Sequence, residues 1–150
     1  MPERVQFELV TPERLLLSEM VEMVVIPGTE GNFGVLPGHA PLISSIRPGT
    51  IDIYEGQAIA RRIFVVSGIA EVTPELCTVL ADEAMAPEEL DRTGIEAELQ
   101  TVGGNLPSLR EHVGHATGTE RDTLLIELRR LERRQEVLQA ELQALTEIQR

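Results

Sequence analysis

The chain has 150 residues and a formal net charge of -12 at pH 7. This excess of negative charge repels phosphate groups, so it argues against a nucleic-acid-binding protein and against attachment to anionic lipid headgroups. The longest apolar runs are far shorter than a membrane-spanning helix, and the start of the chain, MPERVQFELV, lacks the pattern of a secretory signal. Cys77 is the single cysteine, so no disulfide can form within the chain. We expect a cytoplasmic protein with no direct insertion into lipid.

Residues 1–86 alternate between apolar and polar side chains, as strands with one buried face do. In the first of these strands, Val5, Phe7 and Leu9 lie on one face. Several short strands separated by turn signals predict an antiparallel β-sandwich or barrel. The other segments with a strand pattern cover residues 21–26, 50–54, 62–68 and 76–81.

A run rich in glycine and proline, PGTEGNFGVLPGHAPLISSIRPGTI, covers residues 27–51. Phosphate-binding loops need a different glycine spacing with a helix directly afterwards, and Glu30 would bring a negative charge to the phosphate. Turns explain the run better, because the proline of LPGHAP presets φ and Gly38 supplies the positive φ of a type II turn. Gly49 in RPGT repeats this device. The run therefore predicts bends between strands.

Beyond the strand region the apolar period becomes helical. Pro87 suits the first position of a helix. The GGN stretch at residues 103–105 is expected to stop this helix, and a loose linker then extends to Gly118. A second helix opens with TERD at residues 119–122, which fits a capping box with the threonine as the cap. We predict a helical hairpin over residues 87–150.

The second helix carries an apolar stripe at alternating spacings of four and three residues, which is one face of a helix. Two interpretations of this stripe remain open. It packs on the partner helix of its own hairpin, or it forms a seam that also meets another subunit. The residues of the stripe are Leu124, Leu128, Leu131, Gln135, Leu138, Leu142 and Leu145.

Candidate catalytic and metal-binding residues are few. His112 and His115 have the i,i+3 spacing of helical metal ligands, but no third ligand stands at a suitable spacing. His39 has the chemistry of a base for Ser44 or Ser45, but no acidic residue is placed to orient it and no nucleophile-elbow motif is present. We expect a chain that is not an enzyme and that holds no metal or other cofactor.

Four stretches together carry a resemblance to a known family. They are VVIPGTEGNFGVLPGHAPLISSIRPGTI, VVSGIAEV, TVLADEA and EELD, the last leading into the helical part. In these motifs the chain resembles the epsilon subunit of the bacterial rotary, proton-translocating ATP synthase. The resemblance implies an α+β fold, with an N-terminal antiparallel β-sandwich over residues 1–86 followed by a C-terminal α-helical hairpin over residues 87–150.

The resemblance also implies a mechanical function without catalysis. The family's subunit sits in the central stalk with the gamma subunit. Its sandwich stands on the membrane-embedded proton-carrying ring, so it couples rotation of the ring to ATP synthesis. Its C-terminal helices have two positions: they lie folded on the sandwich, or they rise along gamma to the catalytic alpha/beta head, where they restrain ATP hydrolysis. Such a subunit is peripheral and lies on the cytoplasmic face of the bacterial inner membrane.

The motifs assign residues of this chain to these contacts. The ring-facing loop corresponds to Glu30, Gly31 and Asn32, and His39 falls near the gamma contact. The alternative function is a free-standing β-sandwich interaction module that dimerises through its C-terminal helix. In the apolar stripe, the expected partner-binding residues are Leu124, Leu128, Leu131 and Leu138.

Two departures from the family pattern change what we expect. The ATP-binding motif of some members begins with Ile or Leu followed by Asp and ends in Arg-Ala. Here Leu90 and Asp91 are present, but Gly94 and Ile95 replace the Arg-Ala pair. The segment also offers only Arg92 against three acidic residues, Glu88, Glu89 and Asp91, so we expect no useful ATP affinity. Asn32 stands where at least one relative has an acidic residue, which weakens an ion-pair account of the ring contact.

Overall fold

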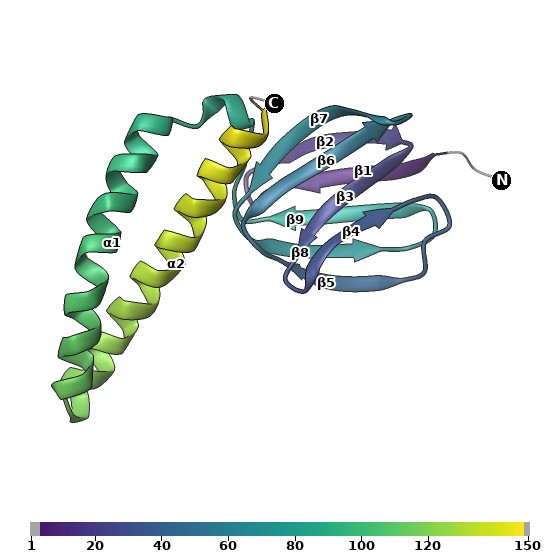
Figure 1. Cartoon of the computed structure of the whole chain (residues 1–150). Coiled ribbons are helices and arrows are strands. Elements are labelled where there is room, and N and C mark those ends of the chain that lie inside the picture. Colours follow the sequence, from purple (N-terminus) through teal and green to yellow (C-terminus); the bar gives the residue numbers. More distant parts are fainter. Residues whose placement is uncertain (1–3, 149–150) are drawn as a thin grey trace. The chain divides into compact units, whose positions relative to one another are not determined.

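The computed structural model describes residues 4–148, and the chain divides into two compact units, one ending at Glu89 and the other beginning at Leu90. The first unit consists of strands and a short 3-10 helix, and the second consists of two long helices (Figure 1). This organisation confirms the predicted α+β fold, in which a β-sandwich precedes two C-terminal helices.

The strand region contains more strands than the sequence pattern predicts. The predicted segment 21–26 is shared by two strands, because β2 ends at Val21 and β3 begins at Met23. The elements of the first unit are β1 (Val5–Val10), β2 (Leu15–Val21), β3 (Met23–Gly28), β4 (Gly31–Val35), β5 (Leu42–Ile46), β6 (Gly49–Glu55), β7 (Ala58–Val65), β8 (Gly68–Val72), β9 (Leu76–Ala81), β10 (Ala84–Met85) and the 3-10 helix η1 (Pro87–Glu89).

The strands pair in two groups, which form the two layers of the sandwich (Figure 1). One group has the order β10-β7-β6-β3, with β4 also paired to β3, and the other has the order β5-β8-β9-β1-β2. The groups are joined where Gly28 of β3 pairs with Ile46 of β5. β1 and β9 pair in parallel, whereas the other described pairs are antiparallel. Alternation carries no information on strand direction, so the sequence could not predict this parallel pair.

The apolar faces of the strands fill the core of the sandwich. Val5, Phe7 and Leu9 share one buried face, as predicted, and each is at most 1% exposed. Burying one side chain of this size contributes about 1.5–3 kcal/mol. Cys77 belongs to the same core, and burial raises the pKa of its thiol to about 12. The thiol therefore stays protonated and unreactive at neutral pH.

The two glycines that were predicted to make type II turns differ. Gly38 has a φ of 83°, which is the left-handed conformation that the predicted turn requires. Gly49 does not have a positive φ, so that prediction was wrong. Its small size matters instead, because a Cβ atom at Gly49 would lie 2.9 Å from the Cβ atom of Pro27. Gly49 thus allows the start of β6 to lie close against the end of β3.

Helix α1 (Arg92–His115) is longer than predicted (Figure 1). The GGN stretch at 103–105 does not stop it, and Pro107 lies inside it. The predicted loose linker is wrong, because the helices are separated only by Ala116 and Thr117. The first predicted helix start was also wrong, since the proline expected there begins η1 instead.

Packing explains why α1 continues through residues that disfavour a helix. Glycine costs about 1 kcal/mol and proline about 3 kcal/mol relative to alanine inside a helix. Val102, Leu106 and Leu109 flank and follow the GGN stretch, and all three are buried. Val102 and Leu106 belong to an apolar cluster shared with the second helix, so tertiary contacts offset the poor intrinsic propensity.

Helix α2 (Gly118–Ile148) follows almost directly (Figure 1). Thr119 lies inside its first turn, where the Thr119 carbonyl accepts a hydrogen bond from the Thr123 hydroxyl at 3.1 Å. The predicted capping position was therefore wrong. Over the residues that the structure describes, neither helix is apolar enough along its length to cross a membrane.

The two helices pack against each other through a common apolar core. Leu138 is fully buried in it, and Leu128 and Leu131 pack at its margin. The first interpretation of the apolar stripe, packing on the partner helix of the same hairpin, is therefore confirmed. The buried members of this core are Ile95, Val102, Leu106, Leu138 and Leu145.

An ion pair also links the two helices. The Arg134 guanidinium donates two hydrogen bonds to the Glu98 carboxylate, at 2.6 and 2.8 Å. These bonds favour the charged carboxylate and lower the pKa of Glu98 below its ordinary value of 4.5. Because the unfolded chain binds the proton more readily, the stabilisation is present above this ordinary pKa and is lost as the pH falls through the lowered one.

We predict that Glu98→Gln lowers the free energy of unfolding of the helical hairpin at pH 7 by less than about 1 kcal/mol, because the pair is exposed to solvent. The difference from the parent chain should shrink as the pH falls below 4.5. Thermal unfolding followed by the helical circular dichroism signal measures both effects. Glu111→Gln, which removes one charge from the same helix, is the control. An undiminished difference at low pH would contradict this account of the pair.

Candidate partner-binding surfaces

The predicted ring-facing loop is the tip of a β-hairpin. The pairing of β3 with β4 ends at Gly28 and Gly31, which leaves Thr29 and Glu30 as a two-residue turn. Glu30, Gly31 and Asn32 are all exposed. The structure thus brings the three predicted loop residues together at one exposed tip.

The backbone at Gly31 needs glycine for conformational reasons. Gly31 has a φ of 132°, which side chains of L-residues rarely allow. A Cβ atom at Gly31 would meet nothing within 4 Å, so replacing Gly31 strains the backbone without causing a clash. A substitution at Gly31 therefore changes the shape of the tip as well as any contact. Glu30 is the better position for testing a contact.

His39 lies in the loop between β4 and β5, which backbone hydrogen bonds hold in place. The N–H of Gly38 donates to the carbonyl of Pro74 at 2.9 Å, and the N–H of His39 donates to the carbonyl of Leu36 at 3.1 Å. The imidazole Nδ1 is 2.7 Å from the carbonyl oxygen of Ala40, so it donates there when it carries the proton. His39 therefore sits half-buried in a fixed turn, with its ring held by the next residue.

The predicted candidates for chemistry are not assembled into a site. The Ser44 hydroxyl donates to the Ser45 carbonyl at 3.0 Å, and in the part of the chain that the structure describes neither serine is hydrogen-bonded to His39. His112 and His115 lie in the last turn of α1, not in a linker as predicted. Among the described residues, no group of three His, Cys, Asp or Glu side chains is placed to share a metal ion.

The four leucines predicted to bind partners differ in exposure. Leu138 is 0% exposed and Leu128 and Leu131 are half-buried, all three in the apolar core between α1 and α2. Leu124 is half-buried outside that core. Nearby on the same helix, Ile126 is 69% exposed. A contact between this stripe and another subunit stays a prediction. Leu124 is the better candidate for it than Leu138, because Leu124 has more accessible surface.

One outward face of the sandwich carries a row of apolar side chains across four strands. Ile69 of β8 pairs with Leu80 of β9, and Leu80 pairs with Val10 of β1. Val10 in turn pairs with Leu15 of β2. Residues directly opposite each other on neighbouring strands point to the same side of a sheet. We call this row the apolar band. Its members Ile69, Leu80 and Leu15 are 49%, 51% and 54% exposed, and Val10 is half-buried.

The apolar band was not predicted from the sequence. Ile69 and Leu80 stand at positions where alternation predicts a side chain facing solvent, since their neighbours Ala70 and Val79 point into the core. These outward apolar residues were the available signal. Their alignment into one row depends on the register between strands far apart in the sequence, which local alternation does not carry.

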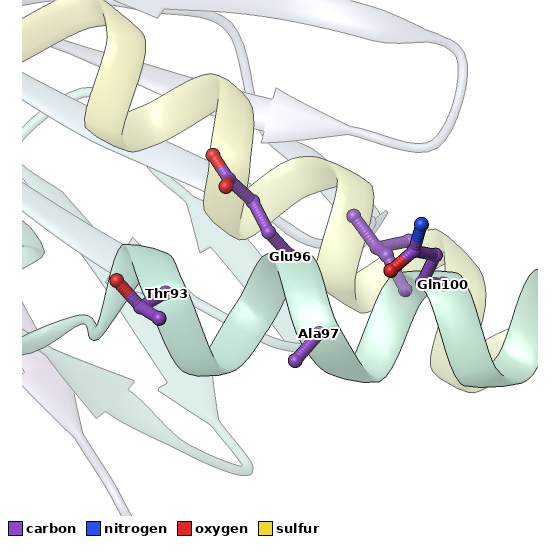
Figure 2. A pocket seen from close by; sticks show the side chains of 5 residues that line it. Thr93, Glu96, Ala97 and Gln100 are labelled. Carbon is purple, nitrogen blue, oxygen red and sulfur yellow. The ribbon is translucent and has the colours of Figure 1, made fainter.

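A shallow depression lies on α1, close to the segment compared above with an ATP-binding motif. Figure 2 shows its lining residues on successive turns of the helix. Glu96 is the charged residue of this lining, and it pairs with Arg92 at 3.5 Å. A carboxylate repels phosphate, so the depression has the wrong charge for a nucleotide. The lining residues are Thr93, Glu96, Ala97, Leu99 and Gln100.

Comparison with known proteins identifies the family. Residues 4–87 match the family model described as the ATP synthase, Delta/Epsilon chain, beta-sandwich domain. The chain belongs to this family. The ATP synthase epsilon chain of Rhodospirillum rubrum is 56% identical over 106 residues, which cover 71% of this chain and 79% of that protein. The epsilon chain of Rhodospirillum centenum is 45% identical over 144 residues, which cover 95% of this chain and 92% of that protein.

A solved structure supports the fold of this epsilon-family chain over nearly its whole length. One chain in the cryo-EM structure of the Euglena gracilis mitochondrial ATP synthase, OSCP/F1/c-ring in rotational state 1, superposes with a TM-score of 0.76 at 21% identity. The superposition covers 97% of this chain and 83% of that one. At this level of identity the likeness concerns the fold alone. The family match itself covers the hairpin tip and the apolar band.

Proposed function

We propose that this epsilon-family chain is a non-catalytic central-stalk subunit of a proton-driven ATP synthase. In this account it binds the gamma subunit and the membrane-embedded ring, and it transmits rotation of the ring towards ATP synthesis. It is peripheral to the membrane, on the cytoplasmic face of the bacterial inner membrane. The observation that carries the proposal is the apolar band, because a permanent partner is needed to cover it.

The surroundings of the apolar band fit a protein interface. In the neighbouring outward row of the same sheet, Glu71 pairs with Thr78, and Thr78 pairs with Glu8. An apolar strip bordered by charged and polar side chains is the usual anatomy of a protein–protein contact. When a partner covers the strip, the free energy becomes more favourable by about 25 cal/mol for each Å² of apolar area removed from water. We assign the apolar band to the gamma subunit.

The hairpin tip is a second and separate surface. It lies at the end of β3 and β4, whereas the apolar band crosses β8, β9, β1 and β2. A domain with two separate contact surfaces is able to connect two partners. We therefore assign the tip, with the exposed Glu30 in its turn, to the membrane ring. Coupling then depends on both surfaces being occupied at once.

The helical hairpin supports a regulatory role within this proposal. It has its own apolar core, so a change in its position does not require the sandwich to unfold. We propose that α1 and α2 restrain ATP hydrolysis when they contact the alpha/beta head. Leu124 and the exposed Ile126 are apolar side chains of α2 that lie outside the core of the hairpin, and we assign this contact to them.

The apolar band gives the first test. Ile69→Asp and Leu80→Asp put a charge at the centre of the proposed interface, and each should weaken binding of the full chain to purified gamma subunit by about tenfold or more. Both side chains face outward, so the sandwich should keep its fold, as checked by circular dichroism. Binding is measured by surface plasmon resonance.

Gln57→Asp is the matched control for this experiment. It adds the same charge at the exposed turn between β6 and β7, outside the apolar band. Its affinity for gamma should equal that of the parent chain. Equal binding by Ile69→Asp and the parent would show that the apolar band does not bind gamma. A stable homodimer of the chain in light scattering would favour the free-standing module instead.

A further inference from the structure

Arg47 stands at the junction between the two layers of the sandwich. It directly follows β5, and its backbone N–H donates to the carbonyl of Pro27 at 3.0 Å. On the other side of the Gly28–Ile46 pair, the N–H of Thr29 donates to the carbonyl of Ser45 at 3.0 Å. These backbone hydrogen bonds therefore hold Arg47 at the base of the β3–β4 hairpin, independently of its side chain.

The Arg47 side chain reaches both ends of the hairpin turn. One guanidinium nitrogen, Nη1, donates to the carbonyl oxygen of Gly28 at 2.7 Å. The other, Nη2, donates to the side-chain oxygen Oδ1 of Asn32 at 2.6 Å. Gly28 precedes the turn and Asn32 follows it. A planar guanidinium presents two N–H groups in a fixed fork, which suits two acceptors at fixed positions better than the single ammonium of lysine does.

Apart from the Gly28–Gly31 pair and the hydrogen bond from the Thr29 N–H to the Ser45 carbonyl, few contacts fix the shape of the tip. Glu30 and Gly31 are exposed. Gly31 has no Cβ atom, so its backbone is freer to move than that of any other residue type. The ring of Phe33 covers Gly28 closely, since a Cβ atom at Gly28 would lie 3.0 Å from Phe33 Cε1. That contact holds the base of the hairpin and not its tip. Arg47 supplies side-chain hydrogen bonds at both ends of the turn.

We propose that Arg47 is a positioning residue, which grips both ends of the β3–β4 turn so that Glu30 is presented to a partner in one geometry. A loop that is ordered before binding loses less conformational entropy when it binds. The inference rests on the proposed function in that the ring is taken as the partner of this tip. It also explains Asn32, whose amide oxygen accepts from Arg47 and leaves Glu30 as the charged group of the turn.

Amide hydrogen exchange of the full chain tests the positioning. Arg47→Ala should raise exchange at residues 29–32 by about tenfold relative to the parent, with exchange in β8 and β9 unchanged. Arg47→Lys keeps the charge but not the fork, so it should behave like Arg47→Ala. Arg61→Ala, which removes an exposed arginine paired with Glu19 at 3.9 Å, should leave the tip as in the parent.

Three results would overturn the inference. The first is unchanged exchange at residues 29–32 in Arg47→Ala, and the second is faster exchange throughout the sandwich, which marks a general loss of stability. The third is full protection in Arg47→Lys, which would assign the effect to charge. ATP-driven proton pumping by the assembled complex separates this inference from the proposed function. A loosened tip with unchanged pumping would leave Arg47 as a positioning residue and would contradict the ring contact.

Discussion

A chain that ends at Glu89 is expected to fold, to join the ATP synthase and to leave ATP hydrolysis less restrained. The apolar core of the sandwich is built from residues up to Ala84, and it contains none of the helical residues among those described. The cut after Glu89 also keeps η1 with the sandwich. The shortened chain should therefore unfold cooperatively, with the modest stability of a small domain.

The expected loss of restraint follows from the proposed role of the hairpin. A preference of only about 1.4 kcal/mol between two hairpin positions sets a tenfold population ratio, so a partner needs little differential affinity to shift it. Removing α1 and α2 removes the restrained state altogether. ATP synthesis should persist, because the apolar band and the hairpin tip are intact. The measurement is ATP hydrolysis and synthesis by the complex reconstituted with the full or the shortened chain.

The shortened chain carrying Ile69→Asp is the matched control. It should fold but bind the complex weakly, which separates loss of regulation from loss of assembly. Two outcomes count against the account. One is failure of the shortened chain to assemble, and the other is unchanged hydrolysis across a range of proton-motive force and nucleotide ratios.

Leu138→Ala is expected to destabilise the helical hairpin by about 2–5 kcal/mol, since it leaves a cavity in a close-packed core. Leu138 is 0% exposed between α1 and α2. On the same helix, Ile126 is 69% exposed, so Ile126→Ala should change stability by less than about 0.5 kcal/mol. Urea unfolding of the full chain, followed by the helical circular dichroism signal, measures both. The two losses of unfolding free energy show whether the apolar stripe of α2 stabilises the chain itself.

The same pair of variants examines the predicted partner contact of the stripe. If Leu138→Ala leaves the hairpin as stable as Ile126→Ala does, and yet weakens binding to the complex, then Leu138 acts at a contact between subunits. The burial of Leu138 favours the opposite result, in which stability falls. Leu124→Ala then becomes the variant that reports on a partner, because Leu124 lies outside the apolar core of the hairpin.

Local patterns were sufficient for the parts of the fold that local physics controls. The alternation of Val5, Phe7 and Leu9 is a direct consequence of strand geometry, and the structure buries that face. The positive φ at Gly38 follows from the turn that its neighbours require. In the candidate sites, the exposure of Glu30 could be anticipated in the same way, because it stands in a glycine-rich segment between strands.

Features set by distant contacts could not be predicted. The helix through Pro107 survives because α2 packs against it, and no property of the residues 103–107 reveals that partner. Gly49 is needed for the approach of Pro27, which is far from it in the sequence. The apolar band and the grip of Arg47 on the hairpin tip depend equally on the register and joining of strands. Surfaces of this kind are recognised only once the three-dimensional fold is known.

The most direct test of the central claim is the composition of ATP synthase purified from the native membrane, determined by quantitative mass spectrometry. We predict that this chain is present in the complex in the same amount as the gamma subunit. We also predict that detergent washes that leave gamma in place do not remove the chain. Absence of the chain from a complex that contains gamma would contradict the account.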